Sequence, residues 1–241
     1  MENSTVGSVS GTVLGMLADL CHKLQHGSLN REELARFLKR ENPFDPSVVT
    51  VILTLTVWQK VYQALGCALD ESLWVEPAPG FWDVYVQKGV TPERVVKAMR
   101  KLGIAVETLG VDLDAATNGR DERDPGKSGA YRVRFRANVE ADEEFKNFSA
   151  DDIKARGIQS NTLTERLLLG LAYFIVTEDK GDDLDARHLD RDNTTLCVGS
   201  RHSDGKVPGV RWHRDYRQVY VHWHSPQSRC AGWRARSAVN A

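Results

Sequence analysis

The chain has 241 residues, of which 41% are hydrophobic and 27% are charged, and its formal net charge is −1 at pH 7. This length is enough for one large domain or two small ones, each with a hydrophobic core. The near-neutral charge argues against attraction of the whole molecule to nucleic acid or to acidic lipid. The first eleven residues lack the basic residues of a signal peptide, and no apolar run approaches the roughly 20 residues that span a bilayer, so we expect no membrane partner.

Residues 1–80 are predicted to form a helical or mixed N-terminal part. Apolar residues at helical spacing predict a first helix over residues 12–26. Asn30 and Glu33 have the spacing of a capping box, which predicts a second helix that ends before Asn42.

The stretch after these helices is ambiguous. Valines and leucines alternate over residues 49–57, which predicts a strand, although Asp45-Pro46 would also begin a helix. From Trp58 the apolar spacing is helical, and Gly66 is the expected end of that helix.

Residues 81–148 are predicted to form a small central α+β unit. Alternation predicts a strand over residues 82–87, and Thr91-Pro92 predicts the start of a helix that ends at Gly103. A second strand over residues 104–106 would complete a βαβ-like arrangement. The residues expected on the buried face of the helix are Val95, Val96, Met99 and Leu102.

Residues 112–129 are polar and contain glycines, which predicts a mobile loop. Gly126-Lys127-Ser128 resembles the end of a phosphate-binding loop, but such a loop needs glycine where this chain has Asp121. We therefore exclude a phosphate-binding loop here.

Residues 131–136 alternate as a strand that places Arg132, Arg134 and Arg136 on one face. Such a row can contact a phosphate backbone. We favour the simpler interpretation that the acidic residues just downstream neutralise it. Those acidic residues are Glu140, Asp142, Glu143 and Glu144.

Residues 149–241 are predicted to form a C-terminal unit of a buried helix plus an antiparallel hairpin. Thr162 and Glu165 have capping-box spacing, and residues 167–176 are apolar or small, which predicts a central buried helix. Residues 194–224 are predicted to form a strand, a turn-rich loop and a long second strand. The three units together predict an α+β fold.

Three segments resemble a known protein family: RDERDPGKSGAYRVRFRANVEADEEFKN, TLTERLLLGLAYF and TLCVGSRHSDGKVPGVRW. Together they are similar to a family of uncharacterised proteins predicted from metagenomic and candidate-phylum bacterial genomes, over about residues 81–239. The resemblance implies a bacterial protein and carries no assigned activity. In that family the position of His224 often holds Cys, and both residue types bind metals.

Four cysteines lie far apart and form no CxxC pair. This pattern argues against a zinc ribbon and favours reduced thiols, as in the cytoplasm. The cysteines are Cys21, Cys67, Cys197 and Cys230.

Residues 195–241 contain eight basic and two acidic residues, a local charge of +6, with aromatic residues between the cations. This composition is typical of single-stranded nucleic-acid binding, in which cations meet phosphates and rings stack on bases. We predict a non-enzymatic protein that holds a polyanion here, either nucleic acid or an acidic protein partner. The residues predicted to make this contact are Arg201, His202, Lys206, Arg211, Trp212, Arg214, Arg217 and Tyr220.

The same residues have a structural interpretation. Trp212, Trp223 and Trp233 would then lie in the core, and the arginines would pair with the acidic segment at residues 178–192.

The alternative function is a small metal- or thiol-dependent enzyme. His222 and His224 share one face of a strand, which suits a metal, and Cys197 suits a nucleophile. No GxSxG motif surrounds Ser200 or Ser203. We expect neither a metal nor a cofactor. The residues of this alternative are Cys197, His202, Asp204, His222 and His224.

Overall fold

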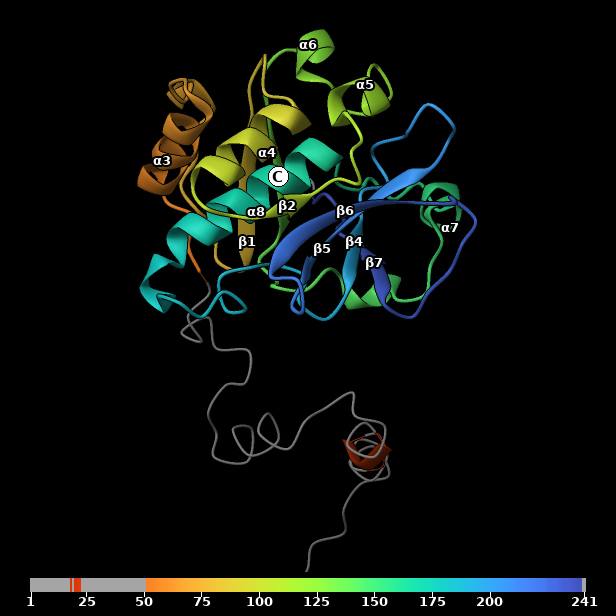
Figure 1. Cartoon of the computed structure of the whole chain (residues 1–241). Coiled ribbons are helices and arrows are strands. Elements are labelled where there is room, and N and C mark those ends of the chain that lie inside the picture. Colours follow the sequence, from red (N-terminus) through yellow and green to blue (C-terminus); the bar gives the residue numbers. More distant parts are fainter. Residues whose placement is uncertain (1–17, 19, 23–50, 240–241) are drawn as a thin grey trace, which may run out of the picture. The chain divides into compact units, whose positions relative to one another are not determined.

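The computed structural model describes residue 18, residues 20–22 and residues 51–239. The first four of these residues are helical and fall within the predicted helix 12–26. The rest of that helix and the predicted helix that ends before Asn42 lie outside the described residues. Residues 50–241 form one unit by themselves, with an α+β fold of helices and two sheets (Figure 1).

Helix α8 (Leu163–Val176) is the centre of this unit and confirms the predicted buried helix (Figure 1). Its capping box is complete, because the side chains of Thr162 and Glu165 each accept a hydrogen bond from the other residue's backbone N–H. The helix packs against α3 (Leu55–Leu65), α4 (Pro92–Lys101) and strands of both sheets.

Helix α3 replaces the end of the strand predicted over residues 49–57, so that prediction was wrong. The hydroxyl of Thr54 accepts a hydrogen bond from the backbone N–H of Val57 at 3.4 Å and caps the helix. Gly66 ends it with φ of 77°, as expected. The helix buries Val57 and Val61 and packs against α8 and α4, so the apolar residues are buried at helical rather than alternating spacing.

The smaller sheet pairs β1 (Phe81–Val86) with β3 (Tyr131–Arg136) in antiparallel register. Arg132 and Arg134 both bind the carboxylate of Asp83 on the neighbouring strand, at 3.0 and 2.9 Å. Arg136 pairs instead with downstream acids, Asp142 at 3.5 Å and Glu144. The row of arginines is therefore neutralised, partly by a residue that the sequence pattern did not indicate.

The larger sheet has the strand order β2-β6-β5-β4-β7. The two outer pairs, β2 with β6 and β4 with β7, are parallel, while the two inner pairs, β6 with β5 and β5 with β4, are antiparallel. β1 and β2 lie in different sheets, so the predicted βαβ-like unit is wrong. The strands are β2 (Val106–Glu107), β4 (Thr194–Leu196), β5 (Val207–His213), β6 (Gln218–His224) and β7 (Trp233–Ala235).

The predicted long second strand is two strands, because the chain turns back between β5 and β6. Arg217 ends this turn with φ of 49°, in the left-handed region. The predicted loop 112–129 also contains regular structure. Its helices are α5 (Leu113–Thr117) and α6 (Pro125–Ser128), and the other short helices are η1 (Glu71–Leu73), η2 (Glu143–Phe145), α7 (Ala150–Ala155) and η3 (Glu178–Lys180).

The main core takes side chains from all three predicted segments, for example Leu53, Val84 and Leu168. Leu102 is an exception to the predicted buried face of α4, since it is 43% exposed just beyond the last helical residue. A second core cluster lies around Phe145 and Ile153. Within residues 18, 20–22 and 51–239, no helix is long and apolar enough to cross a membrane.

Candidate functional site: the outer face of the larger sheet

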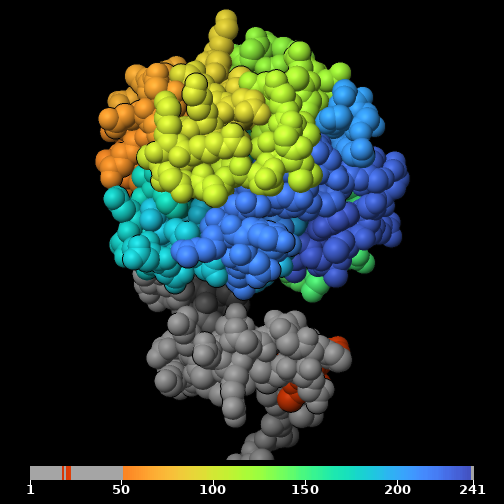
Figure 2. Space-filling view, viewed as in Figure 1, coloured from red at the N-terminus to blue at the C-terminus, as the bar shows by residue number. Residues whose placement is uncertain are grey.

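The two faces of the larger sheet have different environments. Side chains alternate along β5 and β6, so Val210, Trp212, Val219 and Val221 point into the main core beside α8. The opposite face is covered in part by the second core cluster. The β5–β6 hairpin also lies at the surface of the molecule, in blue in Figure 2.

Four rings on this opposite face form a continuous series, which we call the outer aromatic row: Tyr220, His222, His224 and Trp233. Their centroids are 4.9 Å apart from Tyr220 to His222, 4.1 Å from His222 to His224 and 4.0 Å from His224 to Trp233. All four residues are half-buried.

The row runs from β6 to β7 across the intervening strands β5 and β4. Gly209 on β5 makes this contact possible. A Cβ at Gly209 would lie 2.7 Å from Nε2 of His224 and 2.8 Å from Cγ2 of Thr194. Real Cβ atoms do not approach neighbours so closely. Because Gly209 has no side chain, the ring of His224 can lie over it and contact Trp233.

The two histidines of the row are neutral near pH 7. Burial lowers the pKa of His222 to about 3, helped by His224 and Arg211, and burial lowers the pKa of His224 to about 4. Their Nε2 atoms are 3.3 Å apart, which suits a hydrogen bond in which one neutral ring donates and the other accepts. The pair therefore contributes ring surface rather than charge.

Two predicted cations have no carboxylate partner: Arg211, beside the row, and Arg217, in the turn that precedes β6. Arg211 lies directly opposite Tyr220 in the sheet register, and its Nε is buried without a hydrogen-bond partner. Arg217 is exposed in the β5–β6 turn. In the part of the chain that the structure describes, neither residue has an acidic group within 4.0 Å, so both remain able to meet an anion.

Other predicted cations are already engaged. Arg214 pairs with Asp185 at 3.5 Å and with Asp192 at 2.8 Å. Lys206 pairs with Asp204 at 2.7 Å. These contacts agree with the alternative in which basic residues neutralise acidic ones within the chain.

Two further predicted contact residues lie in the loop between β4 and β5. Nη1 of Arg201 donates to the carbonyl oxygens of Val198 and Ser200, at 2.6 and 3.0 Å. His202 lies 2.7 Å from Asp204 through Nδ1, and its ring contacts Trp223. Neither residue reaches the outer aromatic row by any of these contacts.

Trp212 cannot take part in binding, and its assignment as a contact residue was wrong. It is 1% exposed on the inner face of the sheet. Its Nε1 donates to Oδ1 of Asp185 at 2.6 Å, and its ring stacks on His188 at 3.8 Å between centroids. The sequence pattern predicted that these aromatic residues lie in strands, but it did not determine which of them are buried in the core.

The residues of the alternative enzyme form separate pairs rather than one cluster: His202 contacts Asp204, and His222 contacts His224. Cys197 is completely buried in the main core, where burial raises the pKa of its thiol. His222 and His224 lie on the opposite face of the sheet. Among the described residues, no three His, Cys, Asp or Glu side chains gather closely enough to hold a metal.

A perturbed carboxyl group lies elsewhere, beside the N-terminus of α8. Burial raises the pKa of Asp121 to about 7; the side chain of Ser200 opposes this rise, whereas the charge of Glu165 adds to it. Oδ1 of Asp121 is buried without a hydrogen-bond partner. The residue lines a cleft of about 500 Å³. Asp121 lies in the polar stretch 112–129, and nothing in that stretch predicted that its carboxyl group would be buried.

No protein-family model matches this chain, and searches of curated proteins and of solved structures found no match either. The site must therefore be interpreted from its own geometry.

Proposed function

We propose that the outer face of the larger sheet binds single-stranded nucleic acid. Bases would stack on the outer aromatic row, and phosphates would meet Arg211 and Arg217. The observation that supports this proposal most is the row itself, because four half-buried rings, each within 4.9 Å of the next, place several aromatic groups on one face of the sheet. Stacking accepts any base, so we expect little sequence preference.

The charge of the site sets the expected strength. Of the eight basic residues in residues 195–241, five form ion pairs within the chain. With two phosphate contacts, the log–log slope of affinity against salt should be about −1.4, since single strands lose about 0.7 per contact. We expect binding of moderate affinity that depends on rings more than on charge.

An acidic protein partner is less favoured than nucleic acid. Carboxylates would need several free cations, whereas the outer face offers Arg211 and Arg217. The rings would have no comparable role in that complex. The four cysteines of the chain are free, which agrees with a reducing compartment. The proposal therefore includes a location in the cytoplasm of a bacterium.

The test is a titration of fluorescein-labelled oligo(U) and oligo(dT), each about ten nucleotides long, which is within the range of single-strand site sizes. Tyr220→Ala should weaken binding by about 1–3 kcal/mol if the ring stacks on a base. Arg211→Gln should make the salt slope shallower by about 0.7. Arg214→Gln is the matched control, because this arginine already has carboxylate partners.

A folded protein that binds neither oligonucleotide at low salt would contradict the proposal. Poly-glutamate is the second probe. If it binds, and if Tyr220→Ala leaves its affinity unchanged, the acidic-partner interpretation gains instead.

A further inference from the structure

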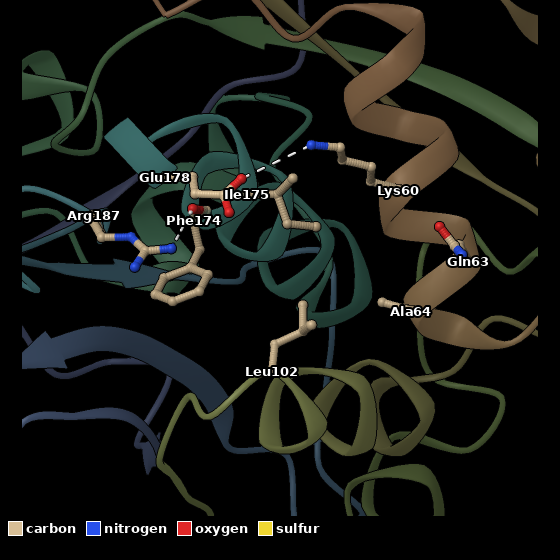
Figure 3. A pocket seen from close by; sticks show the side chains of 8 residues that line it. All are labelled: Lys60, Gln63, Ala64, Leu102, Phe174, Ile175, Glu178 and Arg187. Atoms are coloured by element: carbon tan, nitrogen blue, oxygen red, sulfur yellow. Dashed lines mark hydrogen bonds and ion pairs between the residues drawn. The ribbon is translucent and has the colours of Figure 1, made fainter. Parts of the chain in front are cut away.

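A separate pocket of about 490 Å³ lies among α3, the end of α4 and the end of α8 (Figure 3). This volume is within the range of small-molecule sites. The pocket has an apolar part and a charged rim. Ala64, Leu102, Phe174 and Ile175 make the apolar part, and Figure 3 shows their side chains around one space.

Leu102 is the unusual member of the apolar part. It lies just beyond α4 and is 43% exposed, although α4 buries its own apolar residues Val95 and Met99. Its side chain faces the pocket in Figure 3, between α3 and α8. An apolar ligand would cover surface that is otherwise in contact with water.

Arg187 supplies a cation whose charge is not neutralised by a carboxylate in the described part of the chain. Its Nη2 and Nη1 donate to the carbonyl oxygens of Phe174 and Gly181, each at 3.3 Å. Its Cζ lies 3.7 Å from the centroid of the Phe174 ring, which holds the guanidinium at the pocket. Its Nε is buried without a hydrogen-bond partner.

Lys60 and Glu178 complete the charged rim. They are 3.9 Å apart, and their side chains are 55% and 77% exposed, so their ion pair is weak (Figure 3). Lys60 therefore remains able to turn toward an anion. The rim has two cations and one acid, a net charge of +1, which favours a ligand with a single negative charge.

We propose that this pocket binds a small amphipathic monocarboxylate. The carboxylate accepts from the Nη hydrogens of Arg187 that the carbonyl oxygens of Phe174 and Gly181 leave free, and Lys60 adds a second cation at the rim. The hydrocarbon part covers Leu102 and Ile175. This site is independent of the outer aromatic row and of nucleic-acid binding.

The test uses hexanoate as the probe, measured by calorimetry on the full chain. Hexanamide has the same hydrocarbon part without the charge, and acetate has the charge without the hydrocarbon part. Hexanoate should bind at least about tenfold more tightly than either, because it alone uses both parts of the pocket. Equal binding of hexanamide, or of acetate, would overturn the proposal.

Variants locate the site. Arg187→Met should weaken hexanoate binding by about tenfold, because the methionine keeps the side-chain bulk without the charge. Arg156→Met is the matched control: Arg156 lies over the ring of Phe148 at 4.3 Å, outside the pocket. Hexanoate affinity should not change in this control.

A second variant keeps the test decisive if loss of Arg187 impairs folding. Leu102→Glu places a negative charge on an exposed residue of the pocket and removes no core side chain. It should abolish hexanoate binding through repulsion. Unchanged affinity in Leu102→Glu would overturn the proposal, and oligonucleotide binding should stay intact in every variant.

Discussion

Arg236 donates from Nη2 to Oδ1 of Asp190 at 2.7 Å, and the two side chains are 1% and 0% exposed. The other oxygen of Asp190 accepts from Nε of Arg166 at 2.7 Å and from the hydroxyl of Thr195. The carboxylate of Asp190 thus connects helix α8, strand β4 and Arg236, which directly follows β7.

Replacement of this carboxylate should destabilise the fold strongly. Asp190→Ala leaves two buried guanidinium groups without their common partner, which should cost about 3–5 kcal/mol in the free energy of unfolding. Urea denaturation measures it. Asp182→Ala, at an exposed position, is the control and should leave the midpoint unchanged. A loss below about 1 kcal/mol for Asp190→Ala would show that the pairing is not structural.

Leu168 tests the role of α8 as the centre of the fold. The side chain is 0% exposed, so Leu168→Ala removes buried methyl groups and leaves a cavity. The expected cost is about 2–5 kcal/mol. Thermal melting should show a clear decrease in Tm, whereas Ile52→Ala, at a residue that is 57% exposed, should change it little. Equal melting curves for Leu168→Ala and the wild type would contradict this role.

Asp121 should make the protein less stable as the pH rises. Its folded-state pKa is about 7, above the ordinary value of 3.8, so the folded state holds a proton that the unfolded state has released between these values. The free energy of unfolding therefore falls with increasing pH in that window, by up to about 1.4 kcal/mol per pH unit.

Asp121→Asn should remove that part of the pH dependence and stabilise the protein above pH 7 relative to the wild type. Urea denaturation at several pH values between about 4 and 8 measures the slope. Identical slopes for the variant and the wild type would mean that Asp121 titrates normally.

His222 should make the protein sensitive to acid. Its folded-state pKa is lowered to about 3 from 6.5, so the unfolded state binds the proton first. Stability is fully present above pH 6.5 and is lost as the pH falls toward 3. His222→Phe keeps a ring in the outer aromatic row and should lose less stability between pH 7 and pH 5. Tyr220→Phe, which keeps both histidines, should match the wild type in this comparison.

The sequence by itself was sufficient where the determining contacts are local. The cap at Thr91, the capping box of Thr162 with Glu165 and the helix end at Gly66 each involve residues within one or two turns of chain. Alternation along β3 and β6 likewise assigned their side chains to the correct faces. These features follow from backbone hydrogen bonding and side-chain periodicity, which short segments already contain.

Pairing between distant segments was decided only by the tertiary structure. β7 pairs in parallel with β4 and brings Trp233 to His224, although no local pattern linked them. The core took Trp212, which was predicted to bind a ligand, and left Leu102 exposed, which was predicted to be buried. Which face of an element is buried, and which arginine meets an acid, depends on what packs against it, and that partner is distant in the chain.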